Sequence, residues 1–496
     1  MSESTLSRRA SDRLGGSSRC WLARALIAAI ASCAGLLACG TPVAEPALRF
    51  AAAPIIIVDI DTLRADHLGC YGYSRPTSPN IDRFAESSFR FDWAFSQGPN
   101  TPPSQASLLT GLYPTTHGLI NAKEDRLSDQ VLTLAEVLAA NGYRTAAFVD
   151  GGNMSAHLGL AQGFGVYDDR KLGLAAIQEN ALSWLRDGLG LREDSSASAA
   201  PPPFLLLVHT YDVHTPYAEP PPFGTMFLDG LEPPTPGFTA SNAQLEEVRL
   251  SVWTEEPRRL PENDLRWAEA LYDGGIRQTD ENLGRFFAQL DALGLLDRAI
   301  VVLISDHGEE FQEHGSVLHE KLYATVTRIP WLLRPPGGVE ERVIGHPVEG
   351  VDLMPTLLEM VGVEVPGAVQ GRSLSRLLAG GDPDPGDLAF GESPWFGHRR
   401  FVADSEYRLL LARTTGEMEL FRYREDPLEQ HDLLARGRGE GGLGGEDAAP
   451  RERARWLRGA LRDWHQMVSA ASVSESRATP LPEDVVRQLE ALGYVD

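Results

Sequence analysis

The sequence predicts an α/β fold in which a mostly parallel sheet is flanked by helices. Three short runs, at residues 55–58, 204–208 and 299–304, are apolar throughout and show no alternation. Such runs are typical of strands that are buried on both faces of a parallel sheet. Segments with helical periodicity, at 132–141 and 175–188, separate the first two runs. This alternation of strands and helices favours a parallel sheet.

The remaining elements of the core follow in chain order. Gly142 ends the first helix, and a short strand is predicted directly after it at 144–149. Residues 216–261 are rich in proline and have few long periodic stretches, which indicates a long insertion over the surface. A long helix is predicted at 265–293, and a fifth strand at 329–333.

A stretch rich in Gly and Pro at 380–386 marks a predicted domain boundary. We therefore expect a core domain at 50–385 and a small C-terminal α+β subdomain at 386–496. The expected elements of the subdomain are paired strands at 400–412 and 417–423 around a turn at 414–416, a flexible link at 437–450, and helices at 450–469 and 482–492.

The composition excludes some classes of protein. The chain has 496 residues, with 45 basic and 69 acidic side chains, a net charge of −24. Because proteins grip phosphate backbones through Lys and Arg, this balance argues against nucleic-acid binding. A small anionic substrate needs only a local positive site, so it stays possible. The four cysteines are too few for a disulfide framework.

The N-terminal residues 1–39 have the pattern of an export signal. Five arginines precede an apolar stretch at 25–38, which is shorter than the ~20 residues that span a membrane. The stretch ends in Leu36-Leu37-Ala38-Cys39-Gly40, which resembles a bacterial lipobox. We therefore expect an exported lipoprotein of the cell envelope, bound to a membrane through a lipid on Cys39. The alternative is an uncleaved signal anchor.

Acids and histidines follow three of the buried strands. Asp59 and Asp61 follow the first, His214 the third, and Asp306 with His307 the fourth. Ligands of open α/β sheets bind at the carboxyl ends of the strands, where these side chains should meet. Carboxylate oxygens with imidazole suit a divalent cation. Acids often cap the helix after a strand, but three such strand ends in one sheet favour a functional site.

A second feature is the segment at 100–111. Pro102 and Pro103 suit the entry to a helix, which is predicted at 104–110. Thr101 would lie just before this helix, where free N–H groups favour an anion. A hydroxyl group there can be a nucleophile if a metal lowers its pKa.

Taken together, these residues resemble the sulfatase family of the alkaline-phosphatase superfamily, in a branch with Thr at the nucleophile position. The resemblance covers most of the chain after residue 53 and implies an alkaline-phosphatase-like core. It is carried by these motifs: Asp61-Thr62-Leu63-Arg64-Ala65-Asp66-His67-Leu68-Gly69, Thr77-Ser78-Pro79-Asn80-Ile81-Asp82, Thr101 to Gly111, Tyr113-Pro114, His117-Gly118, Tyr211 to Tyr217, Asp306-His307-Gly308-Glu309, His314-Gly315, Glu419-Leu420-Phe421 and Asp426-Pro427-Leu428-Glu429.

The resemblance also implies roles for single residues. One divalent cation, Ca or Mg first and Mn or Zn as further options, would bind to Asp61, Asp306 and His307, with Asp59 as an acid that many relatives lack. Thr101 takes the position of the nucleophile, and the helix start after it would add N–H donors. The histidines that would contact the ester or protonate the leaving group are His117, His214 and His319. The candidate substrate contacts are Gln105, Asn121, Lys123, His314 and Lys321.

Two departures from the family pattern change the expected chemistry. Typical members have Cys or Ser at position 101, which is oxidised to formylglycine, and an Arg at position 105. Thr cannot form that aldehyde, so no formylglycine is expected, and Gln105 removes a cation. Relatives with Thr cleave phosphodiesters or transfer phosphoglycerol and phosphoethanolamine groups.

We therefore expect a metal-dependent hydrolase of sulfate or phosphate (di)esters that acts through Thr101. Its substrate would be a small anionic ester, or a glycan or lipid headgroup that carries one. The alternatives are a transferase of the same superfamily and an inactive surface lipoprotein that binds glycans or lipid headgroups. A second metal, bound by Asp212, His214 and either His314 or His319, is a further alternative.

Overall fold

The computed structural model describes residues 47–192, 202–252, 254–384, 386–393, 398–435, 448–473 and 481–492. Residues 47–496 form one compact unit, so both parts of the predicted division at 386 belong to it. The predicted signal segment at 1–39 and most of the predicted link at 437–450 lie outside the described residues.

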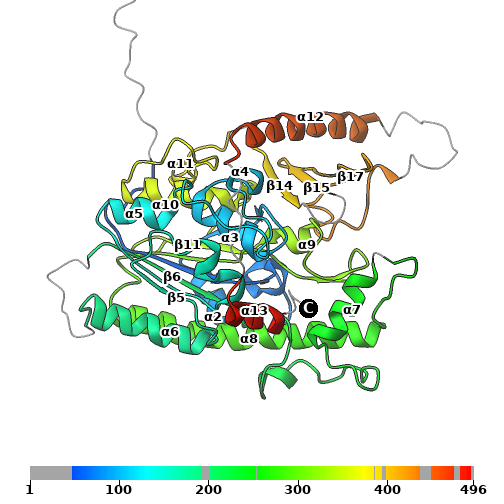
Figure 1. The fold of residues 1–496 in the computed structure, drawn as a ribbon, viewed down its shortest axis with the longest axis horizontal. Coiled ribbons are helices and arrows are strands. Elements are labelled where there is room, and N and C mark those ends of the chain that lie inside the picture. Colours follow the sequence, from blue (N-terminus) through cyan, green and yellow to red (C-terminus); the bar gives the residue numbers. More distant parts are fainter. Residues whose placement is uncertain are drawn as a thin grey trace, which may run out of the picture. The chain divides into compact units, whose positions relative to one another are not determined.

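A sheet flanked by helices forms the centre of the fold (Figure 1). It has eight strands in the order β12-β2-β11-β7-β1-β6-β4-β5. Its middle is parallel, as predicted: β1 pairs with β6 and β7, and β4 pairs with β6 and β5. β11 is antiparallel to both of its neighbours. The strands are β1 Ile55–Ile60, β2 Phe89–Phe91, β4 Arg144–Phe148, β5 Val166–Asp168, β6 Phe204–Thr210, β7 Ile300–Ile304, β11 Trp331–Arg334 and β12 Arg342–Ile344.

The side chains of β1 explain why its sequence is apolar without alternation. Ile55 and Ile57 belong to one buried core, and Ile56 and Val58 to another. The first core is covered by α3 Thr101–Thr110, α5 Leu134–Ala140 and α10 Leu353–Val361. The second is covered by α2 Pro79–Ala85, α6 Leu174–Ser183 and α8 Glu262–Ala292. The sheet is therefore buried on both faces, as the apolar runs predicted.

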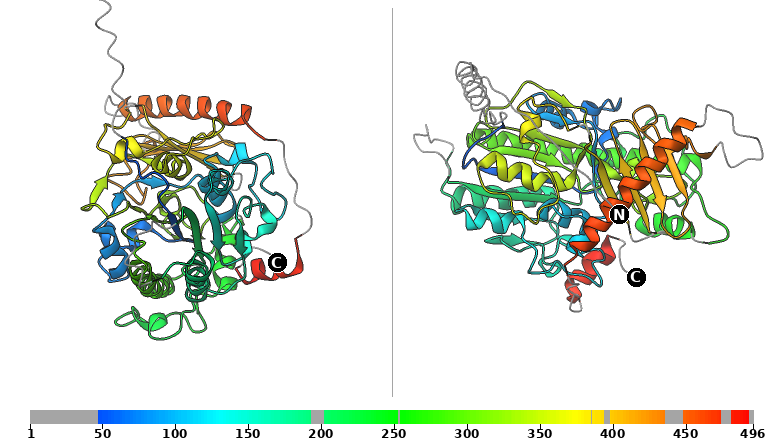
Figure 2. Two further views of the ribbon diagram at one scale, coloured as in Figure 1. Left: turned by 90° about the vertical axis from the view of Figure 1, so that its left-hand side faces the viewer. Right: turned by 90° about the horizontal axis from the view of Figure 1, so that it is seen from above.

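The C-terminal part contains a four-stranded antiparallel sheet with α12 Ala448–Ala470 packed along it (Figure 2). The predicted strand at 400–412 is in fact two strands, because Asp404 accepts hydrogen bonds from the N–H groups of Glu406 and Tyr407 and so stabilises a turn. The strands are β14 Ala389–Ser393, β15 Arg399–Ala403, β16 Arg408–Ala412 and β17 Met418–Phe421.

A buried ion pair joins this sheet to the core. The guanidinium group of Arg408 on β16 lies 2.6 Å from a carboxylate oxygen of Glu429, and neither side chain is exposed. Arg408 also donates to Thr327 Oγ1 in the core, and Glu429 accepts from the N–H of Ala324. Because each charge has several partners, the sheet is held to the core at a defined position.

The shorter elements complete the fold. The predicted strand at 329–333 is divided between β10 and β11, which belong to different sheets. The insertion at 216–261 contains a ten-residue helix, α7, which begins with a capping box of Ser241 and Gln244. The remaining elements are β3 Ala94–Phe95, β8 Glu310–Phe311, β9 Val317–Leu318, β10 Arg328–Ile329, β13 Val348–Glu349, α4 Pro114–His117, α7 Asn242–Ser251, α9 Ala324–Thr327, α11 Ser375–Leu378 and α13 Glu483–Ala491. Among the described helices, none has the length and apolar character of a membrane span.

Candidate active site

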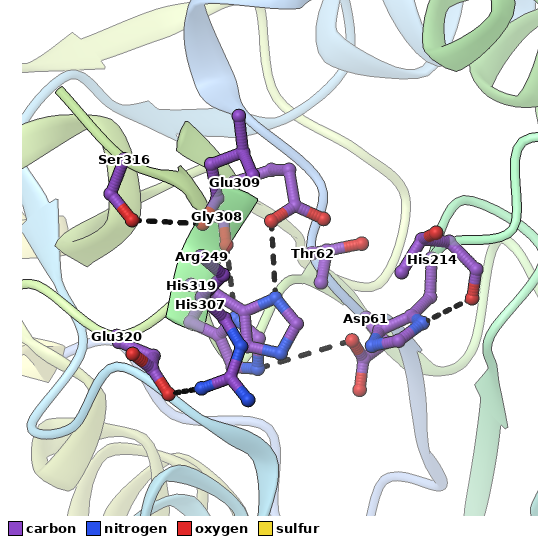
Figure 3. Close-up of polar contacts among 12 residues, drawn as sticks. Asp61, Thr62, His214, Arg249, His307, Gly308, Glu309, Ser316, His319 and Glu320 are labelled. Atoms are coloured by element: carbon purple, nitrogen blue, oxygen red, sulfur yellow. Dashed lines mark hydrogen bonds and ion pairs between the residues drawn. The ribbon is translucent and has the colours of Figure 1, made fainter. Parts of the chain in front are cut away.

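Side chains from two adjacent strands meet at the carboxyl end of the sheet. Asp61 follows β1, and Asp306 and His307 follow β7, its parallel neighbour. Their ligand atoms all lie within 4.8 Å of one another. His307 Nε2 lies 3.5 Å from Asp306 Oδ2. It lies 3.9 Å from Asp61 Oδ1 (Figure 3). The structure thus brings together the three residues predicted to hold a cation, as expected for side chains at the carboxyl ends of adjacent parallel strands.

These three residues fit a divalent cation. All are fully buried, and Asp61 Oδ1 and Asp306 Oδ2 have no hydrogen-bond partner. Burial raises the pKa of Asp61 to about 6 and that of Asp306 well above its usual value. His307 Nδ1 donates to Gly308 O, so the lone pair is on Nε2, which faces the carboxylates. A cation would compensate the buried charges, and oxygen with imidazole nitrogen is a common donor set.

Thr101 lies against this group. Its Oγ1 donates to Asp61 Oδ2 at 2.9 Å and lies 3.5 Å from His307 Nε2. The helix α3 begins at Thr101 rather than three residues later, because prolines are tolerated in the first turn. Pro102 and Pro103 have no N–H, and the N–H of Ser104 donates to Asn100 O. The expectation that this helix start adds N–H donors after Thr101 is therefore wrong.

Asp59 and Gln105 bind to each other behind the three residues. Gln105 Nε2 donates to Asp59 Oδ2, and both side chains are buried. Burial, with Asp306 nearby, raises the pKa of Asp59 to about 8. Asp59 does not belong to the group of possible cation ligands, whose ligand atoms lie within 4.8 Å of one another. A cavity adjoins Thr101 through Asn100 and Pro102, and Gln105 does not line it.

Two histidines line that cavity. His214 Nδ1 donates to Thr215 O at 2.6 Å, and His319 Nδ1 lies 3.1 Å from Glu309 Oε1. Their rings are 5.1 Å apart, and the ring of His319 is 4.6 Å from that of His307. Burial lowers the pKa of both imidazoles well below the usual value. In this environment both are neutral.

His117 has a different position from the other two histidines. Its Nδ1 accepts from the N–H of Leu119, so its proton is on Nε2, which lies 3.2 Å from Ser107 Oγ on α3. Burial lowers its pKa to about 3. His117 does not line the cavity; it contacts the helix that carries Thr101 from behind.

The cavity has a volume of about 250 Å³. Asn100 and Pro102, which flank Thr101, form part of its lining, as do Asn121 and Lys123. Arg249 also lines it, but its guanidinium group is held by Glu246 and Glu320. The cavity therefore combines two of the three predicted histidines and two of the predicted anion contacts with an arginine that is already paired.

Two predicted substrate contacts face elsewhere. Lys321 Nζ donates to His314 O at 2.6 Å. The His314 ring stacks on Tyr323, with ring centres 3.5 Å apart. Neither residue lines the cavity, whereas Asn100 and Pro102 on either side of Thr101 do.

The alternative of a second metal is also not supported. Asp212 accepts from the N–H of Leu174 at the start of α6, which makes it a helix cap. Within the described part of the chain, Asp61, Asp306 and His307 form the one group of three or more His, Cys, Asp or Glu residues whose ligand atoms all lie within 4.8 Å of one another.

Sequence reasoning missed several residues of the site. His209 is opposite Asp59 in the β1–β6 register, and its Nε2 lies 3.7 Å from Asp61 Oδ2; the strand-end rule could have found it. Thr62 is a buried β-branched residue with φ of 57°, and its hydroxyl group has no hydrogen-bond partner. Asn153 lines the cavity with an unpaired side-chain amide.

The C-terminal helix α13 was predicted as a helix but not as part of the site. Leu489 and Leu492 line the cavity. Gln488 accepts from the N–H of Gly152, which precedes Asn153. No local pattern in the sequence indicates that a helix so close to the end of the chain contacts this loop.

Comparisons with known proteins agree with this geometry. The family model described as Sulfatase matches residues 54–363, and the model described as N-sulphoglucosamine sulphohydrolase, C-terminal, matches residues 312–439. The curated arylsulfatase of Clostridium perfringens (strain 13 / Type A) is 25% identical over 436 residues, which cover 77% of this chain and 90% of that protein.

Two solved structures share the fold. A structure of a protein in complex with its substrate D-glucosamine-2-N,6-O-disulfate has a TM-score of 0.66 at 20% identity, and the match covers 84% of this chain and 98% of that one. The phosphonate monoester hydrolase of Agrobacterium radiobacter has a TM-score of 0.63 at 20% identity, with 83% and 96% covered.

Proposed function

Because the chain belongs to the sulfatase family, we propose that it is a metal-dependent hydrolase that cleaves a sulfate or phosphate ester through the hydroxyl group of Thr101. The observation that carries this proposal is the position of Thr101 Oγ1, 2.9 Å from Asp61 and 3.5 Å from His307. Few arrangements other than a nucleophile explain a buried hydroxyl group held against a group of acidic and imidazole ligands beside a cavity.

Thr101 begins the reaction with its proton already directed at an acceptor. A cation held by Asp61, Asp306 and His307 would lower the pKa of a nearby hydroxyl group and offset charge on the ester oxygens. As Thr101 Oγ1 forms a bond to sulfur or phosphorus, its proton moves to Asp61 Oδ2, and the bond to the alcohol oxygen breaks. The group is then attached to Thr101.

The departing alcohol needs a proton, which we assign to His214 or His319. Both rings line the cavity, and each has Nδ1 engaged, to Thr215 O or Glu309. Nε2 is therefore the atom that can exchange a proton with the substrate. Burial lowers the pKa of both rings, and an anionic ester would raise it. The neutral ring then takes a proton from the water that attacks the Thr101 ester, and as the bond from Oγ1 to sulfur or phosphorus breaks, Asp61 returns its proton to Oγ1.

The residues at positions 101 and 105 support one choice of ester. Thr cannot be oxidised to formylglycine, and Gln105 binds to Asp59 rather than facing the cavity. Both features favour a phosphate diester or phosphonate over a sulfate ester. The fold of the phosphonate monoester hydrolase supports this choice, and the glucosamine disulfate complex and the arylsulfatase relative support the sulfate alternative. The predicted lipid anchor on Cys39 would place this activity at the cell envelope.

The test is a hydrolysis panel of aryl sulfate, aryl phosphate, bis-aryl phosphate and aryl phosphonate with added divalent metal. We expect the bis-aryl phosphate or the phosphonate to be the best substrate and Thr101→Ala to lower turnover at least about a thousandfold. Mass spectrometry of acid-quenched protein should find the transferred group on the peptide that contains Thr101.

The matched control is Thr110→Ala. It removes the same hydroxyl group from the same helix, but that group bonds to Ala106 O and to the N–H of Leu112 rather than to the site. Equal loss of activity in both variants, or normal turnover by Thr101→Ala, would contradict the role of Thr101. Dominant turnover of the aryl sulfate would leave that role intact and reverse the preferred ester.

A further inference from the structure

Two further cavities continue from the active-site cavity over the C-terminal sheet. The middle cavity, of about 250 Å³, shares Ile120 with the active-site cavity. The outer cavity, of about 540 Å³, shares Arg400 and Arg413 with the middle cavity. Shared lining residues make the three cavities consecutive, so one elongated molecule can contact all of them.

The outer cavity is strongly basic although the chain as a whole is acidic. Five arginines line it, and none of its lining residues in the described part of the chain is a carboxylate. The net charge of the whole chain is −24, so this cavity is a clear departure from the average. The five residues, named here the basic tract, are Arg400, Arg413, Arg455, Arg458 and Arg462.

The geometry of the basic tract is set by two elements. Arg455, Arg458 and Arg462 are spaced by three and four residues, so they share one face of α12. That helix packs through Leu457 and Leu461 onto the sheet that carries Arg400 (Figure 2). A rigid helix on a rigid sheet keeps these guanidinium groups in fixed relative positions, which lowers the entropy cost of binding.

The arginines of the tract are available to a ligand. The guanidinium groups of Arg413, Arg455 and Arg458 make no ion pair with a carboxylate of the described residues, and all three side chains are exposed. Arg462 pairs with Asp463, but both are more than 60% exposed, so this pair is weak. Arg400 is held in place by Glu392 and His465.

The acids of the middle cavity do not oppose an anion strongly. Glu392 accepts from the N–H of Thr115 and binds Arg400. Asp125 accepts from the N–H groups of Ile120 and Asn121. The charge of Glu392 is therefore paired, and Asp125 is held by two backbone N–H groups of the loop that places Asn121 and Lys123 in the active-site cavity.

We propose that the basic tract binds a linear polyanion, a glycan chain that carries several sulfate or phosphate groups, and directs one of its ester groups into the active-site cavity. Arginine suits these groups because its planar fork of donors matches their oxygens. A row of concave sites suits a flexible chain better than a flat membrane surface. This inference rests on the proposed function, because the cavity at the end of the tract is the proposed site of cleavage.

The binding test uses the full chain with Thr101→Ala, which holds ligand without turnover. Dextran sulfate is the probe, and neutral dextran of the same length is the blank. Replacing Arg413, Arg455 and Arg458 by Ala should weaken dextran sulfate binding by about tenfold or more and reduce its dependence on salt. The matched control replaces Arg170, Arg266 and Arg285, three exposed arginines outside the tract, and should bind as the parent does.

A second measurement tests the connection to the active site. Dextran sulfate should inhibit hydrolysis of a small aryl ester by the otherwise unchanged protein, and the triple variant should resist this inhibition while its kcat/KM on the small ester is unchanged. Equal binding by the parent and the triple variant, equal weakening in the control, or binding without inhibition would each overturn the proposal.

Anionic lipid vesicles provide the last comparison. Tract-dependent binding to phosphatidylserine vesicles without binding to dextran sulfate would overturn the polyanion in favour of a membrane surface. A protein that turns over no ester but binds dextran sulfate through the tract would refute the proposed function while leaving the tract as a polyanion site. The two failures are thus distinguishable.

Discussion

Two regions of the molecule hold their polar groups in opposite states. One is the strand-end cluster of Asp61, Thr101, Asp306 and His307, and the other is the C-terminal region, residues 386–492. In the cluster, every side chain is fully buried and two carboxylate oxygens have no partner. In the C-terminal region, the arginines near the cavities are mostly exposed.

The difference indicates what each region is suited to do. Burying polar groups without partners is unfavourable, and binding of a cation and an ester would lower this free energy. Such groups are therefore suited to catalysis. Exposed charges are solvated before the ligand arrives, and each adds little on its own. We therefore expect large effects of single substitutions in the cluster and small, distributed effects in the C-terminal region.

The largest effect in this comparison is expected for Asp306→Asn. The variant removes one cation ligand, so turnover should fall at least about a thousandfold and added metal should no longer raise the unfolding temperature. In metal-free protein the same change should maintain or raise that temperature, because it removes one of two facing buried carboxylates. Thermal unfolding with and without metal measures both.

Asp404→Asn is the matched control in the C-terminal region. Asp404 is also a buried carboxylate, but it stabilises a turn and pairs with Arg453. Its loss should lower the unfolding temperature by the same amount with and without metal. A metal-dependent shift that survives in Asp306→Asn would show that this residue holds no cation.

The contrast between the two regions also explains which residues sequence reasoning found. Asp61, Asp306 and His214 follow buried strands, so a rule about strand ends was sufficient to place them at one edge of the sheet. His314 and Lys321 were taken from the family resemblance alone, and neither lines the cavity: the His314 ring stacks on Tyr323, and Lys321 Nζ donates to His314 O.

Longer-range packing was not accessible from sequence. The binding of Gln105 to Asp59 depends on how α3 sits over β1. The contact of α13 with the loop at Gly152 joins residues more than 300 positions apart. The positions along the chain of the central strands and of several helices followed from local periodicity, whereas the order of the strands in the sheet and these contacts depend on packing that no local pattern encodes.

An effect of intermediate size is expected when His117 is replaced, on the way the free energy of unfolding depends on pH. The pKa of His117 falls to about 3 in the folded protein because of burial, against about 6.5 when unfolded. As the pH falls, the unfolded chain therefore takes up a proton before the folded protein does. Below pH 6.5 this lowers the free energy of unfolding by about 1 kcal/mol for each pH unit, until the pH reaches the pKa of the folded protein. His117→Gln should lower stability at pH 7.5 but flatten the decline between pH 6.5 and 4 in urea unfolding.

His431→Gln provides the comparison from the C-terminal region. The side chain of His431 is 84% exposed, so its replacement should leave both the stability at pH 7.5 and the slope unchanged. An unchanged slope in His117→Gln would mean that His117 takes up a proton in the folded protein as easily as in the unfolded one.

The smallest effect is expected at α13. Leu489 is buried and lines the active-site cavity. Leu489→Ala should therefore raise KM for an ester of a bulky apolar alcohol by about threefold to tenfold. It should change kcat by less than about twofold, because the contact is made equally in the ground and transition states. Val485→Ala is the matched control: Val485 is buried on the same helix but does not line the cavity. A similar rise of KM in both variants would mean that α13 acts by holding the Gly152 loop and not by touching the substrate. A fall in kcat for Leu489→Ala alone would place the C-terminal helix within the chemistry of the cluster, and the division between the two regions would no longer hold.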